Sequence, residues 1–267
     1  MGSRPTLGSI GGWASLTLLA LIPFVGACGD DPLPPVELPS AADAQEFLAV
    51  TPGSCIRYRF NTTQRATARV TQDAASLPGR TTSRWSFSLA SGGLADERFF
   101  EPQDDGELRL LRFDTSDANG LRVSTRYACA GQEQCPDPDE QEPLMLRLAF
   151  DMDMQAGLTA GDRYEVVTTP ASVSMGVATA ERHTVVVQRT DVDVPVPEGT
   201  TEPGVELTYS RQVGTDAPVT STWRVVPGKG IAQIQEGGVQ YQACSWRYCD
   251  AAGNCEGAAD CNALTCN

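Results

Sequence analysis

The sequence is poor in positive charge. Its 267 residues contain 34 acidic side chains against 20 basic ones, which gives a formal net charge of −14. Lys229 is the only lysine, so nearly all of the basic residues are arginines. A protein that binds nucleic acid needs a basic surface to displace the counterions of the phosphates. The composition therefore argues against DNA, RNA and anionic lipid surfaces as partners.

The sequence also lacks the residues for histidine-assisted catalysis. His183, in the segment "ERHTVVV", is the only histidine, and no G-x-S-x-G motif occurs. Because a serine or cysteine nucleophile needs a neighbouring base, we predict no catalytic residue and interpret His183 as a surface or turn residue. The 34 acidic residues still offer carboxylate pairs, so a carboxylate-based hydrolase stays open as a third functional alternative.

Neither a cofactor site nor a metal site is predicted. In "PGKG", Pro227 and Gly228 suit the central positions of a type II turn, whereas a phosphate loop needs G-x4-G-K-[ST] before a helix. The segment "TSDANG" fails as an EF-hand loop, because its first position holds Thr115 and its twelfth holds Arg126. The acidic run "CPDPDEQEP", residues 135–143, is interpreted as a solvated loop, with a weak calcium site as the alternative.

No apolar run is long enough to span a bilayer comfortably. The longest, "WASLTLLALIPFV" at residues 13–25, follows the single positive charge of Arg4 and precedes the small residues Gly26 and Ala27. A span of the hydrocarbon core needs about 20 apolar residues. The layout is that of a cleaved secretory signal, which we place at residues 1–27.

The end of this signal resembles the lipobox of bacterial lipoproteins. The motif "VGAC" has Val25, then the small residues Gly26 and Ala27, then Cys28. The resemblance implies cleavage before Cys28 and acyl chains on this cysteine, which would anchor the protein in a membrane. Two or three chains hold a protein where a single chain binds reversibly. An ordinary cleaved signal followed by an incidental cysteine is the alternative.

The residues after the proposed anchor form a tether. Residues 28–39, "CGDDPLPPVELP", are polar and rich in proline, and so have no means to pack. In lipoproteins of this kind an aspartate after the cysteine is associated with retention at the inner membrane. Gly29 stands there instead, so the resemblance favours the outer membrane of a bacterial envelope.

The cysteine count predicts four disulfides. Of the nine cysteines, Cys28 is assigned to lipidation, which leaves an even number for an oxidising compartment. These eight are Cys55, Cys129, Cys135, Cys244, Cys249, Cys255, Cys261 and Cys266. Cys129 and Cys135 are close enough to pair, and five tail cysteines cannot pair among themselves. One of the five must therefore bridge Cys55, and we expect it to be Cys244; the other four would form two bridges in one of three pairings.

Zinc is the competing interpretation of the tail cysteines. The gaps between them are four, five, five and four residues, and no histidine lies nearby. Zinc sites usually show C-x2-C or C-x2-C…H spacings. We therefore favour disulfides over a metal.

After a short helix predicted in "SAADAQEFLAV", from Ser40, the chain alternates like antiparallel strands. "CIRYRF" directs Ile56, Tyr58 and Phe60 inward, and "RWSFSL" does the same with its aromatic residues. Further strands are predicted in "ATARV", "ERFFE", "ELRLLRF", "LRVSTRY", "PLMLRLAF", "RYEVVTT", "ASVSMGVAT", "HTVVVQRT", "VELTYSRQV", "STWRVV" and "GIAQIQ". Turn signals such as "LPGR" and "VPGKG" separate them.

The predicted fold class is all-β. We expect an antiparallel meander that forms a barrel, a half-barrel or a sandwich, because these arrangements manage exposed edges. The β domain is placed at residues 40–242, and a disulfide-rich tail at residues 243–267.

The end of the predicted domain resembles a class of uncharacterised bacterial envelope β-proteins. The shared pattern is a Val-Pro-rich turn, a strand, an aromatic strand, then Pro-Gly-x-Gly and a final strand. It is occupied here by Pro197, Gly199, Trp223, Pro227, Gly228 and Gly230. The resemblance covers about 75 residues and implies a meandering sheet able to curl around a ligand.

Two functional hypotheses therefore lead. The first is a non-enzymatic, lipid-anchored envelope protein that binds a protein partner or supports the envelope. The second is a carrier of a lipid or other apolar small molecule in a β-barrel cavity. An interior cavity distinguishes them, because a sandwich packs its centre and a carrier leaves it open.

Overall fold

The structure is a computed structural model. It describes residues 43–60, 64–77, 80–89, 94–104, 108–116, 122–127, 146–147, 157–168, 171–172 and 179–266. The proposed signal, Cys28 and its tether, Cys129 and Cys135, and the acidic run at 135–143 lie outside the described residues.

One short helix and fifteen strands make up the described part of the chain. They are α1 (Ala44–Phe47), β1 (Cys55–Arg59), β2 (Arg65–Asp73), β3 (Thr82–Leu89), β4 (Leu94–Pro102), β5 (Leu108–Ser116), β6 (Arg122–Arg126), β7 (Leu146–Arg147), β8 (Arg163–Thr168), β9 (Ala171–Ser172), β10 (Glu181–Pro195), β11 (Thr201–Val213), β12 (Val219–Val226), β13 (Gly230–Glu236), β14 (Val239–Cys249) and β15 (Cys255–Gly257).

The strands form one open antiparallel sheet. Its order is β8-β10-β11-β12-β13-β14-β1-β2-β3-β4-β5-β6-β9, with β15 beside β14 and β7 beside β5. Each described neighbour along this path is antiparallel, and the end strands β8 and β9 pair on one side only. The all-β meander is confirmed. Of the three predicted arrangements, a single open sheet that curves is the half-barrel.

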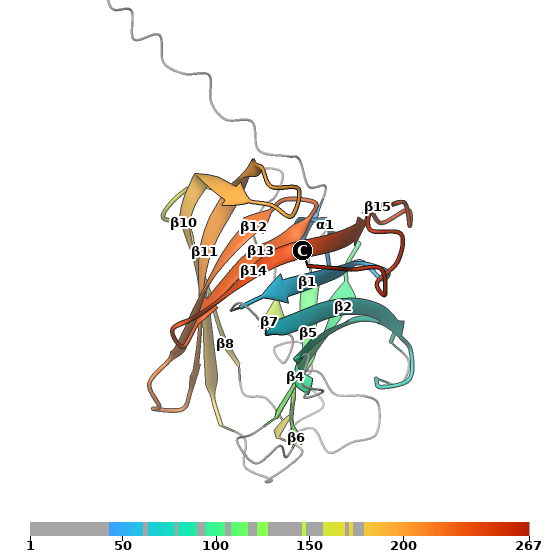
Figure 1. The fold of residues 1–267 in the computed structure, drawn as a ribbon. Helices are drawn as coiled ribbons and strands as arrows, with labels where there is room; N and C mark the ends of the chain where they lie inside the picture. The colour runs from blue at the N-terminus through green and yellow to red at the C-terminus, as the bar shows by residue number, and fades with distance from the viewer. Residues whose placement is uncertain are drawn as a thin grey trace, which may run out of the picture. The chain divides into compact units, whose positions relative to one another are not determined.

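The first strand lies in the middle of this sheet. β1 pairs with β2 on one side and with β14 on the other, so segments nearly 200 residues apart are neighbours (Figure 1). The ladder joins β10–β14 to β2–β6. The side chain of Tyr58 strengthens the connection, because its buried hydroxyl donates a 2.7 Å hydrogen bond to the carbonyl of Ile231 in β13.

Irregular register bends the sheet. The ladders shift between Arg57 and Tyr58 in β1, between Phe87 and Ser88 in β3, and at similar points of β4, β10 and β12. An extra residue on one strand bends that strand and increases the local twist. The bends turn β3–β5 toward β11–β13, although several strands separate them along the path.

The alternation predicted from the sequence sets which side chains face the interior. Ile56 and Tyr58 of β1 are buried, and so are Trp85 and Phe87 of β3, whereas Arg59 is exposed. These residues belong to one continuous hydrophobic core that also includes residues of β10–β14. Apolar side chains at every second position therefore fix which face of the sheet turns inward.

The short helix packs into one end of this core. Asp43 caps α1, because its side chain accepts a hydrogen bond from the backbone N–H of Glu46. Phe47 and Val50 are buried in the core. Gly230, with φ +98°, lets the backbone approach, because a Cβ there would lie 2.9 Å from the Cβ of Ala49.

The predicted turn at "PGKG" is confirmed. The amide of Lys229 donates a 2.9 Å hydrogen bond to the carbonyl of Val226. Gly228 has φ +81°, which the third position of a type II turn requires. The segment therefore joins β12 to β13 and is not a phosphate loop.

A strand runs across the predicted boundary between domain and tail. β14 runs from Val239 to Cys249, through residue 243, and pairs with β1 and β13. Its Trp246 is buried in the main core. Because this segment contains cysteines, we assigned it to the tail, although it is a core strand. The loop-rich part of the tail begins after Cys249.

Three disulfides occur among the described residues. They are Cys55–Cys261, Cys244–Cys266 and Cys249–Cys255. All five tail cysteines are therefore oxidised, which agrees with disulfides and not with the zinc alternative.

The expected pairing of Cys55 is only partly right. A tail cysteine does bridge Cys55, but it is Cys261 and not Cys244. In the β1–β14 ladder Cys55 lies opposite Arg247, so Cys244 is three residues farther along β14. Three residues of strand span about 10 Å, which exceeds the Cα separation of about 7 Å that a disulfide tolerates.

The disulfides differ in the chain they enclose, which predicts unequal contributions to stability. Cys55–Cys261 closes 206 residues and Cys249–Cys255 closes 6. On loop entropy alone, replacing the first pair by serine should lower the free energy of unfolding by about 3 kcal/mol more than replacing the second. Urea unfolding of the two double variants measures the difference, and equal losses would contradict it.

Candidate functional site

A cavity of about 300 Å³ lies on the inner face of the curved sheet. Residues of β3, β4 and β5 line one side, and residues of β11–β14 line the other. Six aromatic side chains surround it: Trp85, Phe87, Phe113, Tyr209, Trp223 and Tyr241. Four aliphatic ones join them: Leu110, Val219, Ile231 and Ile234. The polar lining consists of Asp96, Arg98, Thr115, Arg211, Ser221 and Glu236.

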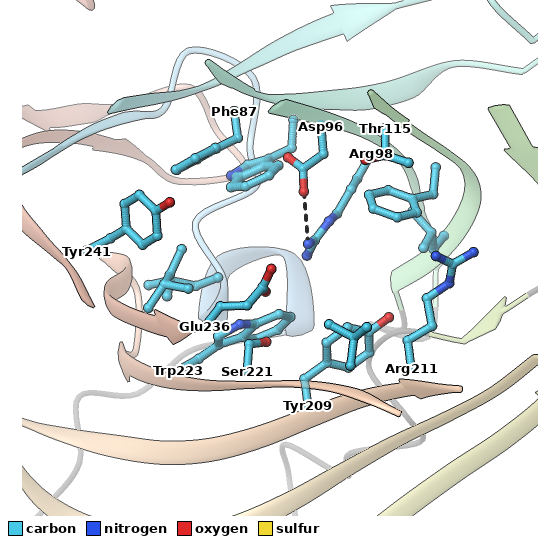
Figure 2. A pocket seen from close by; sticks show the side chains of 16 residues that line it. Phe87, Asp96, Arg98, Thr115, Tyr209, Arg211, Ser221, Trp223, Glu236 and Tyr241 are labelled. Carbon is cyan, nitrogen blue, oxygen red and sulfur yellow. Dashed lines mark hydrogen bonds and ion pairs between the residues drawn. The ribbon is translucent and has the colours of Figure 1, made fainter. Parts of the chain in front are cut away.

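Arg98 projects from β4 into this cavity (Figure 2). Its guanidinium carbon lies 5.1, 5.3 and 5.6 Å from the ring centroids of Trp85, Phe113 and Trp223. Its Nη2 donates a 3.1 Å hydrogen bond to Oδ2 of Asp96, two residues earlier on the same strand. Aromatic faces attract a cation, so the rings and one carboxylate together hold the guanidinium in place.

The surroundings of Asp96 affect the charge of its carboxyl group in opposite directions. Burial raises the pKa of Asp96, and the charge of Arg98 only partly opposes this effect. Glu236 and Glu97 raise it further, because like charges disfavour ionisation. Its second oxygen, Oδ1, is buried and has no hydrogen-bond partner among the residues that the structure describes. Burial and like charges therefore oppose the negative charge of Asp96, and the ion pair with Arg98 is the interaction that favours it.

A buried polar network lies behind another part of the cavity wall. Nε and Nη2 of Arg211 donate to the two carboxylate oxygens of Glu181 at 3.0 and 2.5 Å. The hydroxyl of Tyr127 donates to the same carboxylate at 2.9 Å, and Nε2 of His183 lies 3.0 Å from it. Nδ1 of His183 is 2.9 Å from the hydroxyl of Tyr209. Tyr209 and Arg211 thus connect the network to the cavity.

These contacts set the ionisation of the network. Burial alone would raise the pKa of Glu181, but the hydrogen bonds from His183 and Arg211 hold it at about 2. Burial raises the pKa of Tyr209 to about 12. The network therefore consists of an ionised carboxylate, a guanidinium and neutral tyrosines across the neutral pH range.

The interpretation of His183 as a surface or turn residue is wrong. Its side chain is fully buried, in the third position of β10. β10 is paired here with both β8 and β11, so no turn is present. Its hydrogen-bond partners are Glu181, two residues earlier on β10, and Tyr209 of β11, which local sequence does not place beside it.

The pocket residues follow from the strand pattern only in part. The inward positions of Trp85 and Phe87 were predicted, whereas Asp96 and Arg98 were not. The signal for these two was their position in the alternation of β4. Asp96 and Arg98 stand four and two residues before the buried Phe100, so they share its face, which is otherwise apolar. Lys229, the lysine of the "PGKG" turn, pairs with Glu202 at 2.6 Å and does not line the cavity.

The described residues contain neither a candidate metal-binding cluster nor a candidate membrane-spanning helix. No group there of three or more His, Cys, Asp or Glu side chains could hold a metal ion. No helix in that part of the chain is long and apolar enough to cross a membrane.

No family model matches the chain, and no curated protein matches it. Among solved structures, it is similar to a protein from Bacteroides fragilis with a YmcC-like fold, which is thought to be exported. The two share 12% identity, the match covers 75% of this chain and 98% of the other, and the TM-score is 0.34. A similarity of this degree carries no argument about function.

The buried network predicts that two glutamates paired with arginines contribute unequally. Replacing Glu181 by Gln leaves the guanidinium of Arg211 without its counter-ion, which should cost about 3 kcal/mol of unfolding free energy. Glu165 also pairs with arginines, but on the surface. Glu165→Gln should therefore have little effect, because exposed ion pairs are screened. Urea unfolding at pH 7 compares them.

The same comparison has a pH control. Because the pKa of Glu181 is lowered from 4.5 to about 2, its contribution is present above pH 4.5 and is lost as pH falls toward 2. The stabilities of the native chain and the Glu181→Gln variant should converge in that interval. A Glu165→Gln variant as unstable as Glu181→Gln would contradict the assignment.

Proposed function

We propose that this chain is an exported binding protein that holds a small, partly apolar molecule in the cavity between β3–β5 and β11–β14. The observation that carries the proposal is the cavity itself, about 300 Å³ of open space lined mainly by aromatic and aliphatic side chains. Ligand pockets are typically apolar clefts of this size or larger, with a few polar groups that orient the ligand. The carrier hypothesis thereby moves ahead of a purely structural role.

The open interior favours a binding role for a second reason. Six aromatic side chains converge there without filling the space, and interiors without a ligand are normally packed to the density of organic crystals. Unfilled apolar space forfeits dispersion contacts and so costs stability. A bound apolar molecule would restore those contacts.

The charged groups of the cavity favour binding over hydrolysis. A carboxylate mechanism needs two carboxyl groups placed on either side of the reacting bond. Here Asp96 is tied to Arg98, and Glu236 lies exposed at the end of β13. We therefore propose no catalytic residue.

The location belongs to the same proposal. The signal at residues 1–27 and the lipobox ending at Cys28 support export and a lipid anchor, with the outer membrane favoured by Gly29. The three disulfides support an oxidising compartment, because such bonds form and persist outside the cytoplasm. A tether of residues 28–39 would leave the binding domain free beside the membrane.

Filling the cavity should abolish binding of a neutral apolar probe. Ser221 is buried and lines the cavity, so Ser221→Phe places a ring in the open space. The dye prodan, which is uncharged, should show a blue-shifted emission with the native chain and lose most of this shift with the variant. Thr220→Phe is the matched control, because Thr220 is exposed on the same strand.

A loss of prodan binding supports the pocket only if the variant still folds. Circular dichroism should show the same strand content for both variants. Unchanged prodan emission with folded Ser221→Phe, or no emission change with the native chain, would overturn the proposed pocket.

The anchor is tested separately. Cys28→Ala removes the sulfur that acyl chains would modify, so the full chain should leave the membrane fraction or remain unprocessed. Fractionation of cells and the mass of the N-terminal peptide report the result. A variant that is cleaved and retained in the membrane as before would contradict the lipid anchor.

A further inference from the structure

We infer that the ligand of this cavity is a small apolar amine, whose positive charge lies beside Glu236. The inference rests on the proposed function and deepens it, because it assigns a charge to the molecule that the cavity takes. It follows from which charged groups of the cavity already have partners.

Both guanidinium groups of the cavity are already paired. Arg98 pairs with Asp96 at 3.1 Å, and Arg211 binds both oxygens of the buried Glu181. The polar lining thus contains two cations that are neutralised by their own carboxylates. Neither cation is left to attract an anion.

Glu236 is the charged lining residue that remains. No hydrogen bond or ion pair involves its side chain among the residues that the structure describes. In Figure 2 its carboxylate points into the cavity beside Trp223 and Ser221. With the two pairs neutral, the cavity carries about one net negative charge, which favours a cationic ligand.

The aromatic lining suits the same kind of ligand. Three rings already surround the guanidinium of Arg98 at 5.1 to 5.6 Å, which shows that this interior holds a cation stably. Tyr241 and Phe87 lie across the cavity from the arginines (Figure 2). An ammonium group near their faces would gain cation–π attraction in addition to the charge of Glu236.

An acid fits less well. To reach Arg98, its carboxylate would have to compete with Asp96, whose Oδ1 is already buried without a partner in the described part of the chain. Displaced Asp96 would be a buried carboxylate with no counter-ion, which is costly. The approaching anion would also face Glu236. A negative ligand is therefore disfavoured both by the displacement of Asp96 and by repulsion from Glu236.

Two probes that differ mainly in charge test the inference. 4-Phenylbutylamine and 4-phenylbutyrate share a phenyl ring and a four-carbon chain, and each has about a dozen non-hydrogen atoms, suited to a small pocket. Isothermal titration calorimetry at pH 7 with the oxidised chain should give an affinity for the amine at least about tenfold higher than for the acid.

Variants at Glu236 locate the charge. Glu236→Gln should weaken amine binding about fivefold, as expected for one partly exposed ion pair. Glu236→Lys should reverse the preference and favour the acid. Asp191→Asn is the control, because it removes the same charge from an exposed position of β10 outside the cavity, and it should change neither affinity.

The outcomes separate this inference from the proposed function. Equal affinities, tighter binding of the acid, or an effect of Asp191→Asn equal to that of Glu236→Gln would overturn the amine assignment. Binding of prodan without binding of the amine would overturn it as well and leave the pocket standing. Failure of all three probes would overturn the proposed function together with the inference.

Discussion

The antiparallel ladder between β1 and β14 is the interaction on which the rest of the structure depends. It joins two runs of hairpins, β1–β6 and β10–β14, into one sheet. Without it neither run would face the other, and the space between β3–β5 and β11–β13 would not exist. Three further contacts secure it: the Tyr58 hydrogen bond to β13, the burial of Trp246, and the Cys55–Cys261 disulfide. The tail cysteines thus stabilise the strand pairing that forms the pocket.

Much of this fold follows from local pattern. Alternation in "CIRYRF" and "RWSFSL" gave correct strands and correct inward faces, and the turn at Pro227 and Gly228 was predicted from the φ that glycine permits. The pairing of β1 with β14 was not predicted. The β14 segment carries two cysteines, Cys244 and Cys249, which led us to assign it to the tail, and its pairing with β1 is a contact between distant parts of the chain. Local periodicity is silent about such contacts.

The candidate site was harder to predict than the fold for a related reason. Its defining groups are charged residues on inward faces, where an alternating pattern expects apolar ones. Arg98 is tolerated because rings from β3, β5 and β12 surround it, and Glu181 because Arg211 and Tyr127 donate to it. Each of these partners comes from a different strand. A buried charge is stable only when such partners converge, and their convergence is a property of the folded chain.

We propose above that the curved sheet holds a small molecule in its cavity. Native mass spectrometry of the chain purified from an oxidising periplasm, followed by extraction of whatever is bound, tests it most directly. We expect one small molecule per chain, extractable and carrying an amine. A chain that retains its disulfides but shows the mass of the polypeptide alone, with nothing in the extract, would contradict it.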